Sequence, residues 1–129
     1  MAIQRPSLAH IIMIALALLW TGLILYLMLT PGEDTPAEAV SRFFGGTDAT
    51  DWVGHVILFG GLMGVWYQAL SGITARAKAW QYALVISLVV GISTESAQSA
   101  IVNRGTAFWD YIGNVTGILL VAWGVRYWS

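Results

Sequence analysis

Three pairs of hydrogen-bonding side chains stand three or four residues apart in this sequence, which places the members of each pair on one face of a helix. The pairs are Asp51 with His55, Glu95 with Gln98, and Asp110 with Asn114. Imidazole and carboxylate groups can act as general bases, and a guanidinium can stabilise negative charge. His55 and Glu95 are therefore the candidate catalytic residues, and the six paired residues together with Arg104 are the candidate binding residues.

Other chemistries are not indicated. The chain has no cysteine, which excludes thiol catalysis and cysteine-ligated metals. It has no serine nucleophile elbow, HExxH motif or phosphate-binding glycine loop. Asp51, His55, Glu95 and Asp110 could in principle ligate a divalent metal. One histidine with scattered carboxylates does not form a recognisable metal motif, so we predict neither a metal nor another cofactor.

The composition indicates a membrane protein. Apolar residues make up 57% of the chain and charged residues 10%, against about one quarter charged in soluble domains. The net charge of -1 gives no indication of a nucleic-acid partner, and we expect none. Four apolar stretches, at about residues 8–30, 51–72, 80–102 and 109–128, are each long enough to cross a hydrocarbon core of about 30 Å. The first is too long for a signal-peptide core and is taken as a span.

We therefore predict an all-α membrane protein, a single domain of four transmembrane helices in an antiparallel bundle. Residues 35–38, which read TPAE, resemble a capping box with proline at the first helical position. Val40, Phe43 and Phe44 follow, so we expect a short interfacial helix between the first and second spans.

Lysine and arginine residues suggest the orientation. Arg5, Arg76, Lys78 and Arg126 fall on one side of the membrane, and only Arg42 and Arg104 fall on the other. By the positive-inside rule both termini of this multi-pass protein are predicted to be cytoplasmic.

Antiparallel connectivity brings the start of the second span, the end of the third and the start of the fourth to one membrane face. Glu95 lies roughly 20 Å into its span at about 1.5 Å per residue. An ionised group near the bilayer centre costs at least about 2.5 kcal/mol, so Glu95 should face the bundle, with His55 and Arg104 as candidate partners. Glycines that favour close helix packing there are Gly60 with Gly64, Gly113 with Gly117, and Gly91.

The complete spacing resembles the VanZ-like family of small membrane proteins. The residues that carry the resemblance are Asp51, His55, Glu95, Gln98, Arg104, Asp110, Asn114 and Gly117. The resemblance implies a protein of the bacterial cytoplasmic membrane, related to one linked to low-level resistance to teicoplanin, a lipid-tailed glycopeptide. The family name carries no agreed biochemical activity.

Several functions fit this pattern. The leading hypothesis is an extracytoplasmic polar pocket that recognises a lipid head group, a lipid-linked envelope precursor or a lipophilic glycopeptide antibiotic. The alternatives are an accessory subunit that packs against partner membrane subunits, and a membrane-embedded hydrolase or transferase. The polar residues could also serve structure alone, by capping helices, bridging charges and cross-linking the bundle.

Overall fold

The computed structural model describes residues 5–31, 35–98, 100–101 and 108–128. Within these residues the chain is helical and has no strand. The helices are α1 (Leu8–Leu29), α2 (Pro36–Phe43), α3 (Asp48–Ser71), α4 (Arg76–Gln98) and α5 (Phe108–Trp128). All except α2 are long and apolar enough to cross a membrane. The predicted all-α fold, with a short helix between the first two spans, is confirmed.

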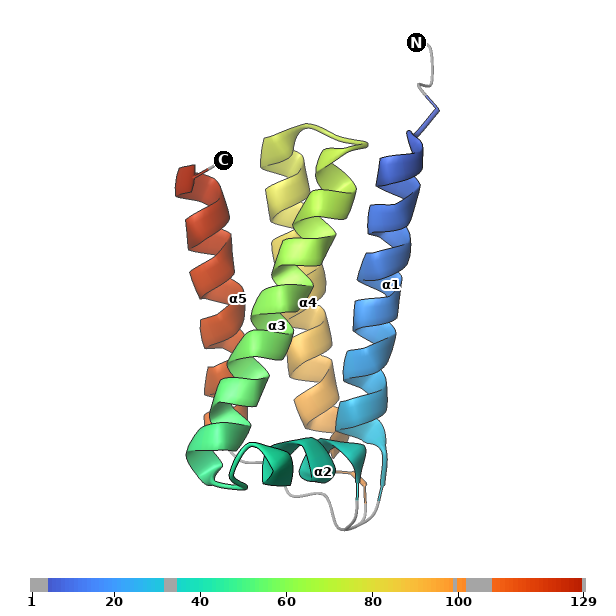
Figure 1. The fold of residues 1–129 in the computed structure, drawn as a ribbon. Helices are drawn as coiled ribbons and strands as arrows, with labels where there is room; N and C mark the ends of the chain where they lie inside the picture. Colours follow the sequence, from blue (N-terminus) through green and yellow to red (C-terminus); the bar gives the residue numbers. More distant parts are fainter. Residues whose placement is uncertain (1–4, 32–34, 99, 102–107, 129) are drawn as a thin grey trace.

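The four long helices run antiparallel to their neighbours in sequence, and α2 lies across one end of the bundle (Figure 1). The start of α1 and the end of α5 lie at the opposite end (Figure 1). The starts of α3 and α5 and the end of α4 therefore meet near α2, as the connectivity predicts.

Side-chain caps begin three of the helices. The hydroxyls of Ser7, Thr35 and Thr47 accept hydrogen bonds from backbone N–H groups in the first turns of α1, α2 and α3. Between α2 and α3 the chain turns through Gly45 and Gly46, whose φ angles are 113° and 66°. Glycine adopts these left-handed conformations without the steric cost of a Cβ atom.

The observed helix bounds differ from the predicted spans by a few residues. α3 begins at Asp48 because Thr47 provides its cap. α4 begins at Arg76, before the predicted residue 80, since charged residues lower the hydropathy of a first turn without preventing it from being helical. Its end at Gln98 precedes the predicted residue 102, and the N–H of Ile101 bonds back to Gln98 O at 3.1 Å.

The core lies along α3, which packs against α1, α4 and α5. Phe59, Leu62 and Met63 of α3 are fully buried, together with Ile24 of α1 and Ile118 of α5. Many large apolar side chains point outwards, such as Leu19 at 69% exposure. Such a surface is unfavourable in water at about 25 cal/mol per Å² and is suited to lipid.

The backbones of α3 and α5 approach closely at Gly117. A Cβ atom at this position would lie 2.2 Å from the carbonyl oxygen of Val56, so only glycine fits without moving a helix. Gly60 on α3 faces the same contact, 3.2 Å from Gly117 O for a Cβ atom. The predicted close approach of glycine-bearing helices is thus present between α3 and α5.

Indole hydrogen bonds connect neighbouring helices inside the apolar region. Trp20 Nε1 donates to Leu58 O at 2.8 Å and joins α1 to α3. Trp80 Nε1 donates to Ala122 O at 2.8 Å and joins α4 to α5. A tryptophan with a satisfied N–H can therefore serve packing here as well as interfacial anchoring.

Candidate functional site

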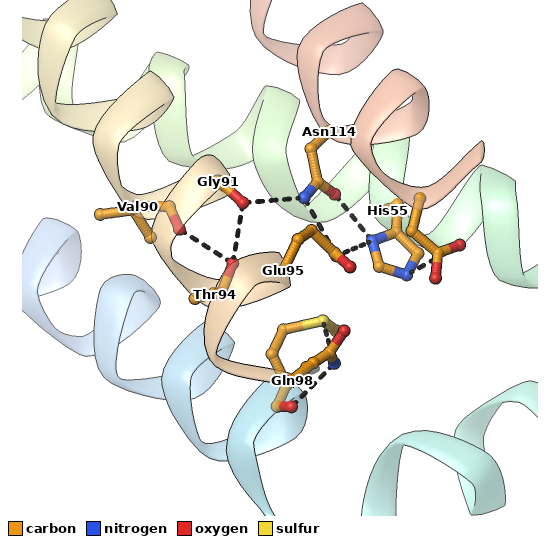
Figure 2. A network of polar contacts seen from close by, with 9 residues as sticks. His55, Val90, Gly91, Thr94, Glu95, Gln98 and Asn114 are labelled. Carbon is orange, nitrogen blue, oxygen red and sulfur yellow. Dashed lines mark hydrogen bonds and ion pairs between the residues drawn. The ribbon is translucent and has the colours of Figure 1, made fainter. Parts of the chain in front are cut away.

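His55 of α3, Glu95 of α4 and Asn114 of α5 meet at the end of the bundle that carries α2 (Figures 1 and 2). His55 and Asn114 are 59 residues apart in sequence, and Glu95 and Asn114 are 19 apart. Because each residue comes from a different helix, their contact depends on the close packing of all three helices.

The side-chain amide of Asn114 is oriented by two acceptors. Its Nδ2 donates to Gly91 O at 3.3 Å and to Glu95 Oε1 at 3.2 Å (Figure 2). Only the nitrogen of an amide can donate, so this orientation leaves Oδ1 facing the ring of His55. Oδ1 lies 2.7 Å from His55 Nδ1.

This contact assigns the two ring nitrogens of His55 different roles. Since Asn114 Oδ1 can only accept, Nδ1 carries a proton and donates it to the bond. Nε2 lies on the side of Asp110, 3.7 Å from its Oδ1. That separation exceeds ordinary hydrogen-bond length, so Nε2 keeps its capacity to bind another atom.

Glu95 is fully buried, and its Oε1 lies 3.4 Å from His55 Nδ1. Gly91, one turn earlier on α4, has no side chain, and a Cβ atom there would contact Asn114 and Phe59. These are ordinary contact distances of 3.5–3.6 Å, so a residue as small as alanine would still let Asn114 reach the backbone of α4. The Asn114 amide and the Nδ1–H of His55 both face Glu95 Oε1, and these contacts offset the cost of burying a carboxyl group.

Two other predicted site residues make different contacts. Asp51 accepts a hydrogen bond from the Ser41 hydroxyl, which joins the start of α3 to α2. Gln98 Nε2 donates to Met28 O at 2.8 Å, so this buried side chain joins α4 to α1 (Figure 2). The Gln98 contact corresponds to the helix cross-linking that the structural alternative predicts.

The predicted residue Arg104 lies outside the described residues. Of the other six candidate binding residues, four form one cluster, which consists of His55, Glu95, Asp110 and Asn114. The remaining two, Asp51 and Gln98, join neighbouring helices.

A pocket of about 990 Å³ lies beside this cluster, between α2 and the adjoining parts of α1 and α3. Its polar lining includes His55, Asp110, Asp51 and Gln98, whereas Leu27, Val40, Ile57 and Leu58 are among its apolar lining residues. Glu95 and Asn114 do not line it. The pocket reaches His55, and Glu95 lies behind the imidazole.

Sequence reasoning missed the part of α2 and α1 in this pocket. Ser41, Arg42 and Met28 line it, although none was a predicted site residue. The predicted short helix between the first two spans could have indicated this part of the pocket. A helix that crosses the end of a bundle can cover the polar residues there.

No family model, curated protein or solved structure matches this chain.

Proposed function

We propose that this chain is a VanZ-like, multi-pass protein of the bacterial cytoplasmic membrane that binds an amphiphilic ligand in the pocket beneath α2. The observation that carries the proposal is the pocket itself, where one surface joins apolar side chains to His55 and Asp110. Ligand sites typically combine such an apolar lining with a small number of polar groups that fix orientation.

The two parts of the pocket suit the two parts of an amphiphile. Leu27, Ile57 and Leu58 would contact an acyl or prenyl chain, and the polar end would contact the head group. Its volume of about 990 Å³ is at the upper end of the usual range of about 300–1,000 Å³. The pocket therefore has room for part of a flexible chain beside a head group.

The distribution of cationic residues supports an extracytoplasmic pocket. Arg76 and Arg126 belong to the helix ends far from α2, and Arg42 lies in α2 itself. With the cationic end in the cytoplasm, α2 and the pocket face outwards. Head groups available there include those of membrane lipids, lipid-linked envelope precursors and lipophilic glycopeptides.

A glycine pair provides a matched test. A Cβ atom at Gly54, which lines the pocket, or at Gly124, which does not, would meet no atom within 4 Å. Gly54→Leu should fill the pocket without disturbing the helices, and Gly124→Leu should add a side chain elsewhere.

The measurement is native mass spectrometry of the protein purified gently in nanodiscs. Wild type and Gly124→Leu should retain one class of amphiphile, and Gly54→Leu should lower its occupancy at least about tenfold, which corresponds to about 1.4 kcal/mol. Equal occupancy in all three proteins would contradict the proposal. A co-purifying polypeptide in place of the amphiphile would favour the accessory-subunit alternative.

A hydrolase or transferase is the second candidate, and the observation that favours it is the fixed imidazole of His55. A histidine whose Nδ1 is held by an acceptor presents Nε2 to a substrate as a positioned base. In the same preparation, conversion of the bound amphiphile with time in wild type but not in His55→Gln would support this candidate. A bound species of constant mass would count against it.

A further inference from the structure

We propose that His55 Nε2 and the Asp110 carboxylate bind a divalent transition-metal ion at the polar end of the pocket, with Glu95 behind the imidazole. Each of the three residues offers one ligand atom, and these atoms lie within 4.8 Å of one another. Adjacent ligands of a tetrahedral zinc ion lie about 3.4 Å apart. His55 Nε2 lies 3.7 Å from Asp110 Oδ1, so a small side-chain rotation would bring both to bonding distance. Glu95 Oε1 lies against the other ring nitrogen, 3.4 Å from Nδ1.

The orientation of His55 suits a metal ligand. Metal-binding histidines almost always donate the second ring N–H to a carbonyl, a carboxylate or water, which fixes the ring and its tautomer. Asn114 Oδ1 accepts that proton from Nδ1 at 2.7 Å. Nε2 is left as the ligand atom, on the side of Asp110.

Asn114 is in turn held by Gly91 O, whose position is set by the α4 backbone. The orientation of the imidazole therefore does not depend on a mobile surface side chain. Asn114 acts as a positioning residue, since it would touch His55 and Glu95 but not the ion.

The charges near the cluster also favour a cation. Glu38, Asp51 and Asp110 line the pocket, and Arg42 is the single lysine or arginine in the described lining. Behind His55 lies the carboxyl group of Glu95, which is fully buried. A divalent ion would reduce the repulsion between the carboxylates that line the pocket.

The donor set indicates which ions would bind. One imidazole nitrogen with carboxylate oxygens suits Zn²⁺ or Mn²⁺, and the chain has no cysteine to select a softer metal. Two protein ligands leave coordination positions open to water or to another ligand. His55 and Asp110 line the pocket, so an oxygen of a head-group phosphate or carboxylate could occupy one of them. Only the binding of a head-group oxygen to the ion rests on the proposed function.

The test is titration of the protein with Mn²⁺ in phosphatidylcholine nanodiscs, followed by the loss of the electron paramagnetic resonance signal of free Mn²⁺. Wild type should bind one ion per chain, and Zn²⁺ should displace it because Zn²⁺ is higher in the affinity order. His55→Gln and Asp110→Asn should each weaken binding at least tenfold.

Two controls match these variants in chemistry. His10→Gln removes the only other histidine, which bonds to Ser7 at the far end of the bundle. Asp48→Asn removes an exposed acid from the first turn of α3 that does not line the pocket. Both should bind Mn²⁺ as wild type does. Asp110 has a partly exposed side chain, so its variant should fold even if another substitution does not.

Absence of Mn²⁺ and Zn²⁺ binding in wild type would overturn the inference, as would unchanged binding in folded Asp110→Asn. The amphiphile measurement repeated in excess EDTA separates this inference from the proposed function. Retained amphiphile without metal binding would reject the metal site alone. Metal binding with equal amphiphile occupancy in wild type and Gly54→Leu would reject the proposed function alone.

Discussion

Replacement of Gly117 by alanine tests whether the contact between α3 and α5 holds the polar cluster together. The added Cβ atom would lie 2.2 Å from Val56 O and 2.9 Å from its carbonyl carbon. Both are backbone atoms and cannot rotate away. Non-bonded atoms are most stable at about 3.5–4.0 Å, so the two helices must separate by about 1 Å.

This separation should destabilise the protein by about 1–3 kcal/mol, the usual cost of overpacking a well-packed core. Gly124→Ala is the matched control on the same helix, because a Cβ atom there would meet nothing within 4 Å. It should be neutral or stabilising by up to about 1 kcal/mol, because alanine favours a helix over glycine.

The assay is unfolding in mixed micelles with increasing sodium dodecyl sulfate, followed by helical circular dichroism. The same displacement should lengthen the 2.7 Å contact between His55 and Asn114, because these residues belong to the two separating helices. Mn²⁺ affinity should therefore fall in Gly117→Ala and not in Gly124→Ala. Equal unfolding midpoints for the two variants would refute the packing argument.

Two further substitutions test individual hydrogen bonds. Trp20→Phe removes the donor to Leu58 O and should cost about 0.5–1.5 kcal/mol in the same unfolding assay. Trp123→Phe, at a side chain 59% exposed, should change little. Equal effects would argue against a stabilising role for the partly buried indole bond. Thr35→Ala removes the cap that accepts from Glu38 N at 3.2 Å and should weaken α2 by about 1 kcal/mol, seen as roughly fivefold faster amide hydrogen exchange there. Unchanged exchange in α2 would refute the capping role of Thr35.

The sequence was sufficient to predict the four spans, because a long apolar stretch with few charges has few alternatives to a membrane-crossing helix. Connectivity alone then placed His55, Glu95 and Asn114 at one end of the bundle. The start of α2 followed from Thr35 and Pro36, whose capping chemistry is local and readable from neighbouring residues.

Details that depend on tertiary contact were not predictable. Spacing on a helix places Gln98 on the same stripe as Glu95, yet its amide bonds to Met28 O on α1. Asp51 similarly bonds to Ser41 of α2 and not to the cluster. Which partner each group meets depends on how neighbouring helices are rotated and on which backbone carbonyls are near, and a single sequence does not specify either.

The bond between Asn114 and Glu95 also constrains how the chain can be inserted into a membrane. α4 is synthesised before α5, and Glu95 precedes Asn114 by 19 residues. During translation the carboxyl group therefore exists before the amide that will bond to it. Before α5 emerges, His55 of α3 is already present, and its Nδ1 lies 3.4 Å from Glu95 Oε1 in the finished bundle. Early packing of α4 against α3 therefore lowers the cost of inserting this acid, and the Asn114 amide completes its pairing when α5 arrives.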